Sequence, residues 1–228
     1  NEDVEVSRWM HKVLKRKKVD IQTDTMATEI NDEYILVSIG VEGNSSGFGL
    51  KKIGIEIGSN NHIIVDKNGK TNLDNIYAVG DVIGPPWLAH VSSSEGLYVV
   101  EHIAKLSPKK IDYDCVPACT YSKPEIGSIG LSQKILDERG IDYKVVKSFF
   151  NANGKAVASD STEGFIKILV SDRNQILGAH IIGSNATEMI SEFSLAMSNN
   201  LSVENILDSI HPHPTFSEAI FETLMQLR

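Results

Sequence analysis

The stretch Gly164–Gly183, GFIKILVSDRNQILGAHIIG, contains two apolar runs joined by the five polar residues Ser171–Gln175. Each run is rich in β-branched side chains, which favour strands. The polar residues Asp172–Gln175 are typical of a turn, because Asp and Asn side chains hydrogen-bond to their own backbone. We therefore predict a hairpin with strands over Gly164–Val170 and Ile176–Gly183.

The sequence on either side of this hairpin predicts the rest of a sheet and its helices. Further strands are predicted over Val116–Tyr121, Ile126–Gly130 and Tyr143–Phe149. Helices are predicted over Ser132–Glu138, Ala186–Ser198, Val203–Ser209 and Phe216–Leu227. Strands joined by short turns, with helices gathered late, are typical of an antiparallel sheet covered by helices on one face. We therefore expect residues 109–228 to form a self-contained α+β unit.

The composition bounds the classes of function. Of the 228 residues, 41% are hydrophobic and 23% are charged, as in soluble globular domains. The net charge of -8 gives no basic footprint for nucleic acid. No run approaches the ~20 apolar residues of a membrane span, so no membrane partner is expected. Cys115 and Cys119 are too few for a disulfide framework and are expected to be reduced and partly buried. No metal site is predicted.

The N-terminal side of the chain predicts shorter elements. Ser7–Lys17 has the spacing of an amphipathic helix. Val19–Thr23 and Tyr34–Gly40 predict short strands, and a small hairpin is predicted around Ile63–Val65 with its turn at Lys67–Gly69. These elements are typical of partial α/β segments.

A Gly-Asp pair closes a buried strand predicted over Asn75–Val82, and a helix is predicted over Ser93–Ala104. An acidic residue at the C-terminal end of a strand, just before a helix, lies where open α/β sheets bind ligands. Gly80 would let a ligand approach the backbone closely, and Asp81 could accept hydrogen bonds from sugar-like hydroxyls. Gly-Asp is also common turn chemistry, so the pair alone defines no site.

The segment His211–Glu218, HPHPTFSE, places His213 between two prolines and five residues before a glutamate. Proline fixes φ and lacks an N–H, so the loop is stiff, and a cis His213–Pro214 bond is predicted. Thr215 and Glu218 have the spacing of a capping box. The carboxylate could equally hold the histidine ring and favour its charged form, as for a general base. Spacing alone leaves both interpretations open.

Together these segments resemble the flavoprotein disulfide reductases. The resemblance runs almost collinearly from about Asp74 to Leu227. Within the family, the His-x-His-Pro-Thr-x-Ser-Glu form is most similar to that of the members that oxidise dihydrolipoamide. The segments that carry the resemblance are Tyr77–Asp81, Leu88–His90, Ile111–Pro117, Tyr121–Ile126, Leu177–Gly183 and His211–Glu218.

This resemblance implies an oxidoreductase of 2-oxo acid dehydrogenase complexes. Electrons would pass from dihydrolipoamide through a redox disulfide and FAD to NAD, and a lipoyl domain would be a partner. His213 is implied as the catalytic base, oriented by Glu218, acting in a homodimer at the flavin of the opposite subunit; His211 would shape the loop. Implied cofactor contacts are Asp81, the backbone of Trp87, Leu88, Ala89 and His90, and Gly40 near the nicotinamide.

Three parts that the family's chemistry needs do not occur in this sequence. They are a Gly-x-Gly-x-x-Gly turn for the flavin pyrophosphate, a Cys-x4-Cys redox pair and a second glycine-rich turn for NAD. The chain also begins at Asn1 without a methionine, and a segment before Tyr34 is suspected to be missing. We expect a catalytically incomplete fragment. Residues 1–41 would be a remnant of the NAD-binding domain, 42–108 the returning segment of the FAD-binding domain, and 109–228 the interface domain.

Two alternatives stay open at this point. The polypeptide could act only as a dimerisation or docking module, or belong to a reductase of a glutathione-like disulfide. The Ile126–Leu131 and Phe150–Lys155 stretches favour an organelle matrix, either plastid or mitochondrion, and bacterial cytoplasm is the alternative.

Overall fold

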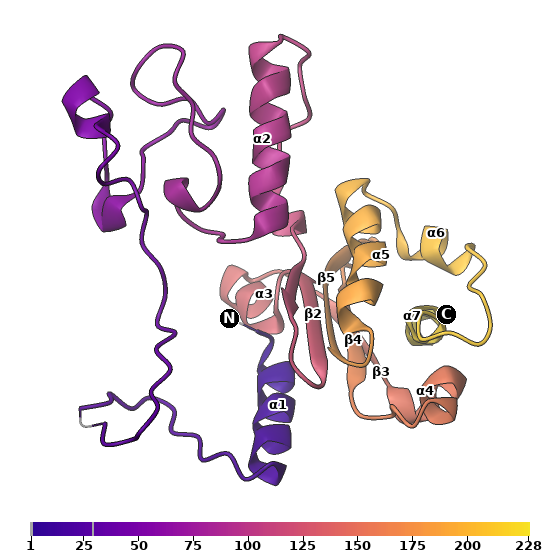
Figure 1. The fold of residues 1–228 in the computed structure, drawn as a ribbon. Coiled ribbons are helices and arrows are strands. Elements are labelled where there is room, and N and C mark those ends of the chain that lie inside the picture. Colours follow the sequence, from indigo (N-terminus) through magenta and orange to yellow (C-terminus); the bar gives the residue numbers. More distant parts are fainter. Residues whose placement is uncertain (1, 29) are drawn as a thin grey trace. The chain divides into compact units, whose positions relative to one another are not determined.

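The computed structural model describes residues 2–28 and 30–228. These residues form two compact units (Figure 1). The first unit joins Asn1–Asp24 to Asp112–Arg228, and the second is Thr25–Ile111. No helix among the described residues is long and apolar enough to cross a membrane.

The first unit is built on a five-stranded antiparallel sheet with the order β1-β2-β5-β4-β3. In its central hairpin, β4 and β5 pair Lys167 with His180 and Phe165 with Ile182. All five predicted strands are confirmed, which confirms the antiparallel α+β class. Their bounds are β1 Ala118–Thr120, β2 Glu125–Gly130, β3 Lys144–Phe149, β4 Phe165–Val170 and β5 Ile176–Gly183.

Helices α5 and α7 cover one face of this sheet (Figure 1). Phe193 and Ile190 of α5 and Ile220 of α7 are almost fully buried with the strand residues Ile168 and Ile181, so this face holds the main core. The α-helices here are α3 Gln133–Arg139, α4 Gly154–Ala158, α5 Ala186–Ser198, α6 Val203–Leu207 and α7 Glu218–Leu224. Short 3-10 turns are η4 Tyr113–Cys115, η5 Phe150–Ala152 and η6 Met225–Leu227.

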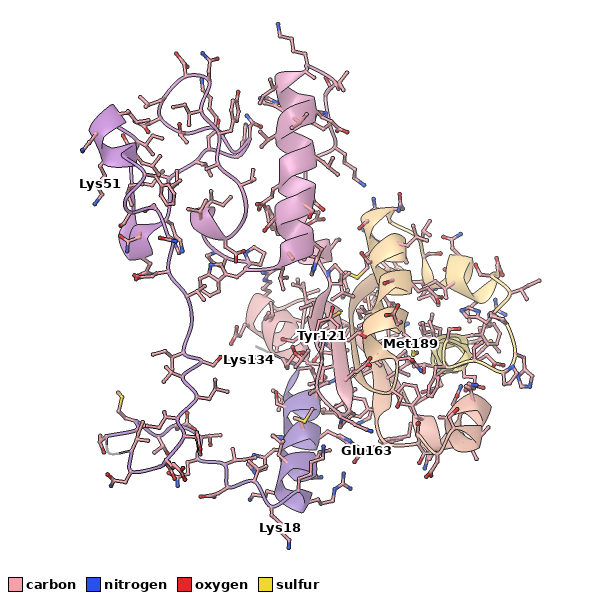
Figure 2. All side chains as sticks on the ribbon, in the orientation of Figure 1. Lys18, Lys51, Tyr121, Lys134, Glu163 and Met189 are labelled. Carbon is pink, nitrogen blue, oxygen red and sulfur yellow. The ribbon has the colours of Figure 1, made fainter. Side chains whose placement is uncertain are left out.

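The opposite face of the sheet is covered by α1, Val4–Arg16. Val6 and Trp9 of this helix pack with Phe165 and Ile182, and Figure 2 labels Glu163, whose carboxylate pairs with Arg16 at the end of α1. The sheet is therefore covered by helices on both faces, whereas the sequence predicted helices on one face. The reason is visible in β4, where every residue is buried, so neither face of the central hairpin is left for water.

A buried lysine connects α1 to this second face. The Lys167 ammonium lies 3.0 Å from both carboxylate oxygens of Asp3 and 3.0 Å from Oε1 of Glu5, and it also donates to Gln133. The side chains of Lys167 and Asp3 are 0% and 1% exposed. Asp3 also caps α1 by accepting from the Glu5 N–H, so the same carboxylate begins the helix and holds the lysine.

His180 lies on the same face and makes stability depend on pH. Its Nε2 is 3.1 Å from the Leu131 carbonyl oxygen, and burial lowers the pKa of the ring below its ordinary value. As the pH falls, His180 therefore binds a proton in the unfolded chain before it does so in the folded chain. Stability should fall as pH drops below about 6.5, by at most about 1.4 kcal/mol per pH unit.

We expect His180→Gln to remove this part of the pH dependence while keeping an amide donor for the Leu131 carbonyl. The measurement is urea unfolding of the chain at pH 7, 6 and 5, followed by Trp9 fluorescence in a Trp87→Phe background. Equal pH slopes for the variant and its background would contradict the assignment.

Among its described residues the second unit has one α-helix, α2 Ala89–Ile103, which confirms the helix predicted over Ser93–Ala104. The predicted turn at Lys67–Gly69 is also confirmed, because the Gly69 N–H donates to the Asp66 carbonyl at 3.0 Å. Isolated bridges pair Ile57 with Ile63 and Lys70 with Tyr77. The 3-10 turns are η1 Leu50–Ile53, η2 Ser59–Asn61 and η3 Gly80–Ile83.

Three predicted strands are wrong. Val19–Thr23, Tyr34–Gly40 and Asn75–Val82 form no strand in the described part of the chain. A strand needs a neighbour that accepts and donates the ladder hydrogen bonds, and these segments find none of sufficient length. The exposed fractions of Leu36 and Ile39, 94% and 92%, show that these two apolar side chains lie open to solvent.

Candidate functional site

The predicted His213–Glu218 pair is formed in the structure. His213 Nδ1 lies 2.7 Å from Glu218 Oε1, and the other carboxylate oxygen accepts the Thr215 N–H at 2.7 Å. The His213 side chain is 78% exposed, whereas that of Glu218 is 20% exposed. One side of the imidazole is therefore anchored while the ring stays open to solvent.

The local chain explains how this loop is held. Pro212 and Pro214 flank the histidine, and the His213–Pro214 bond is cis, as predicted. The Thr215 hydroxyl donates to the Pro212 carbonyl at 2.7 Å, so it does not cap the helix. The capping box is consequently only half present: Glu218 binds the Thr215 N–H, and α7 begins at Glu218 rather than Phe216.

The electrostatics suit proton transfer. The Thr215 N–H, and then the His213 ring, hold the pKa of Glu218 below its usual range, so the carboxylate is ionised at neutral pH. An ionised carboxylate at Nδ1 accepts a hydrogen bond from the Nδ1–H group, which leaves the Nε2 lone pair as the basic site. A neighbouring negative charge also stabilises the imidazolium formed when Nε2 takes a proton.

The predicted flavin contacts of the second unit gather at one helix end. Asp81 is exposed in the first turn of η3, and Leu88 is the N-cap of α2, which Ala89 and His90 open. No side chain in the described residues caps this end of α2, and the Leu88 N–H donates to the Pro86 carbonyl at 3.0 Å. A helix start of this kind favours an electron-rich group.

Gly80 is explained by packing. It has a φ of +76°, and a Cβ there would lie 2.9 Å from Ser92 Oγ on α2. Its N–H donates to the Glu95 carboxylate, which is buried, at 2.7 Å. Glycine at position 80 therefore allows the backbone to approach α2 closely. This contact explains the glycine without a ligand. The sequence held a signal for Glu95, since it interrupts the apolar series Val91 and Val99 at helical spacing.

Gly40 is not brought together with these residues. It lies in the exposed 34–41 segment, and a Cβ there would meet nothing within 4 Å, so no cradle for a cofactor surrounds it. The polar groups at Asp81 and at the start of α2 fit a flavin. The Asp81 carboxylate could accept hydrogen bonds from the hydroxyls of a flavin, and the backbone N–H groups at the start of α2 suit its electron-rich ring atoms. The described residues around Gly40 do not by themselves fit a nicotinamide nucleotide.

The two cysteines are confirmed as free and partly buried. Burial, and then the Glu125 carboxylate, raise the pKa of the Cys119 thiol above its ordinary value. A thiol in such surroundings is not a thiolate at neutral pH, so it is a poor nucleophile.

Sequence reasoning missed Glu192, a residue of α5 that binds the His211 ring at 3.0 Å. The two residues are 19 positions apart and lie on different elements, so no local spacing predicts their contact.

Two family models match the chain. Residues 116–224 match "Pyridine nucleotide-disulphide oxidoreductase, dimerisation domain", and residues 1–96 match "Pyridine nucleotide-disulphide oxidoreductase". The relatives include dihydrolipoyl dehydrogenase from Bacillus subtilis, 39% identical over 98% of this chain and 52% of that protein. The mitochondrial dihydrolipoyl dehydrogenase of Pisum sativum is 40% identical over 87% of this chain and 40% of its own length.

Among solved structures, LpdA from Mycobacterium tuberculosis is 27% identical with a TM-score of 0.78, and the match covers 82% of this chain and 41% of that one. The chain thus spans about half the length of the relatives it matches or less. The alignment with the Bacillus subtilis protein runs over 247 residues, more than this chain contains, so that relative carries internal residues missing here. The chain belongs to the family of pyridine nucleotide-disulphide oxidoreductases.

Proposed function

We propose that this chain forms the C-terminal half of a dihydrolipoamide dehydrogenase. The complete enzyme would oxidise the dihydrolipoamide of a 2-oxo acid dehydrogenase complex through a redox disulfide and FAD to NAD. The observation that carries the proposal is the 2.7 Å contact between His213 Nδ1 and Glu218 Oε1, in a loop that leaves the ring exposed. The dihydrolipoyl dehydrogenases among the relatives support the choice of substrate.

In this proposal the residues of the chain move one proton. The nucleophile in thiol–disulfide exchange is the thiolate, so a dithiol substrate must lose a proton before it attacks a disulfide. His213 Nε2 accepts that proton, and the Glu218 carboxylate stabilises the resulting imidazolium. The proline-flanked loop keeps the base in one orientation, so less conformational entropy is lost when the base is oriented toward the substrate.

Asp81 and the backbone at Trp87–His90 would hold FAD, with Asp81 accepting hydrogen bonds from the ribityl hydroxyls and the start of α2 facing electron-rich ring atoms. When bound, the flavin supplies two-electron transfer between the disulfide and the nicotinamide. Gly40 is proposed near the nicotinamide, at a site that needs residues from outside this chain.

We assign residues 1–41 to the NAD-binding domain, 42–108 to the returning part of the FAD-binding domain and 109–228 to the interface domain. The match of residues 116–224 to a dimerisation domain supports a homodimer, in which His213 serves the flavin of the opposite subunit. A lipoyl domain is the proposed macromolecular substrate. We propose an organelle matrix as the location, with bacterial cytoplasm as the alternative, since the relatives include mitochondrial and bacterial proteins.

A direct assay separates this proposal from its alternatives. The protein that carries this chain together with the N-terminal half of the relatives should be yellow and should reduce NAD with dihydrolipoamide. Reduction of glutathione disulfide with NADPH, without oxidation of dihydrolipoamide, would favour the glutathione-reductase-like alternative.

The isolated 228-residue chain should be inactive, because it carries neither the redox cysteine pair nor a glycine-rich turn. We expect a preparation without flavin absorbance that sediments as a dimer, the behaviour of a dimerisation module. Turnover of dihydrolipoamide by the isolated chain would contradict the expectation of an incomplete site.

A further inference from the structure

A second histidine of the same loop is held differently from His213. The His211 side chain is 9% exposed, and its Nε2 lies 3.0 Å from Oε1 of Glu192 on α5. Its Nδ1 lies 3.2 Å from the Ser209 carbonyl oxygen, and its ring packs against Phe221 of α7 with the centroids 5.9 Å apart. The ring therefore connects α5, the loop and α7.

The two partners determine the chemical form of this ring. A carbonyl oxygen can only accept a hydrogen bond, and an ionised carboxylate can only accept as well. Both ring nitrogens of His211 can donate to these two oxygens at once only when the ring is an imidazolium. A neutral ring, in either tautomer, would leave one lone pair facing an acceptor oxygen.

Several acidic side chains lie around this ring. Asp208, which follows α6, and Glu218 and Glu222 of α7 line the same hollow as His211, and Glu192 approaches from α5. The His211 charge adds to the effects of Thr215 and His213 that lower the pKa of Glu218. Burial, and then Glu218, raise the pKa of Glu222.

We propose that His211 is a positioning residue for the His213–Glu218 pair. Held as a cation between Glu192 and the Ser209 carbonyl, it fastens the loop to α5 and keeps a positive charge beside Glu218. This inference rests on the proposed role of His213 as the base. It adds a second, partly buried carboxylate–imidazolium pair that orients the exposed one.

The test uses the full-length holoenzyme with dihydrolipoamide and NAD. His211→Gln and Glu192→Gln should each lower kcat by about tenfold to a hundredfold, because a small displacement of a catalytic group is that costly. The double variant should lose no more than His211→Gln alone, since the two residues act as one unit. In His211→Gln the acidic limb of kcat/KM should also move to higher pH, because a nearby cation no longer opposes protonation of His213.

Glu188→Gln is the matched control, since Glu188 is an exposed glutamate one turn earlier on α5. It should leave kcat and the pH profile unchanged. If His213→Gln abolishes turnover while His211→Gln and Glu192→Gln stay within about twofold of the parent with an unshifted pH profile, this inference fails and the proposed function stands. If His213→Gln itself is active, the proposed function fails first.

A second measurement does not depend on activity. In the 228-residue chain with 15N-labelled histidine, NMR at pH 7 should show both ring nitrogens of His211 protonated. Glu192→Gln should convert the ring to a neutral tautomer at that pH. A neutral His211 ring in the unsubstituted chain would overturn the inference.

Discussion

His213→Gln should lower the turnover of dihydrolipoamide by the full-length enzyme about 10²- to 10⁴-fold, the range that a positioned general base contributes. The glutamine amide can still donate to Glu218, whose Oε1 lies 2.7 Å from His213 Nδ1, so the loop should keep its shape. It has no lone pair of suitable basicity for the substrate thiol. The measurement is steady-state NAD reduction across pH 6 to 9.

The pH dependence separates loss of a base from loss of structure. Without His213 the substrate thiol must ionise by itself, so the residual rate should rise with pH toward the thiol's own pKa, about 8.5 for a free cysteine. Glu218→Gln should cost less than His213→Gln, because the ring keeps a hydrogen-bond partner but loses the charge that stabilises its protonated form.

His11→Gln is a matched control, because His11 lies on α1 and not in the 209–217 loop. It should leave turnover unchanged. Survival of His213→Gln turnover within about tenfold of the parent would reject the assignment of the base.

The sheet was predictable because its strands satisfy local rules and their neighbours are present. Residues 164–183 combine β-branched runs with a polar turn, and the ladder pairs Phe165 with Ile182 as a hairpin should. The strand predicted over Tyr34–Gly40 had an equally apolar sequence. It failed because a strand is stable only when another strand supplies its hydrogen bonds, which is a property of the surrounding chain.

In the candidate site too, contacts between residues close in the sequence were predictable and contacts between distant elements were not. His213 and Glu218 are five residues apart, so local spacing allowed their contact, and the resemblance to the family favoured it over a simple capping box. Glu192 reaches His211 from another helix, and such a contact depends on how α5 packs against the loop. Lys167 shows the limit most clearly, because a lysine inside an apolar strand gives no indication of which distant acid will pair with it.

Lys167→Met should destabilise the first unit by about 3–5 kcal/mol, the cost of removing one partner from a buried ion pair. Asp3 is 1% exposed and would remain as a buried carboxylate facing a methyl group, while Glu5 keeps Lys147 as a partner. Urea unfolding of the chain measures the loss. In a Trp87→Phe background the remaining tryptophan is Trp9, which packs edge-on against Phe165 at 5.5 Å and so reports this face of the sheet.

A second substitution tests whether charge, rather than lost packing, is the cause. In Lys167→Met with Asp3→Asn, the amide oxygen can still cap α1 through the Glu5 N–H, and no uncompensated charge remains at position 3. Most of the lost stability should return, because a neutral buried pair avoids the desolvation cost. Lys134→Met is the control, since Lys134 is 71% exposed and its pair with Glu138 should contribute less than about 1 kcal/mol. If Lys167→Met proves no more destabilising than Lys134→Met, the buried lysine is not what joins α1 to the sheet, and the apolar contacts of Val6 and Trp9 are sufficient.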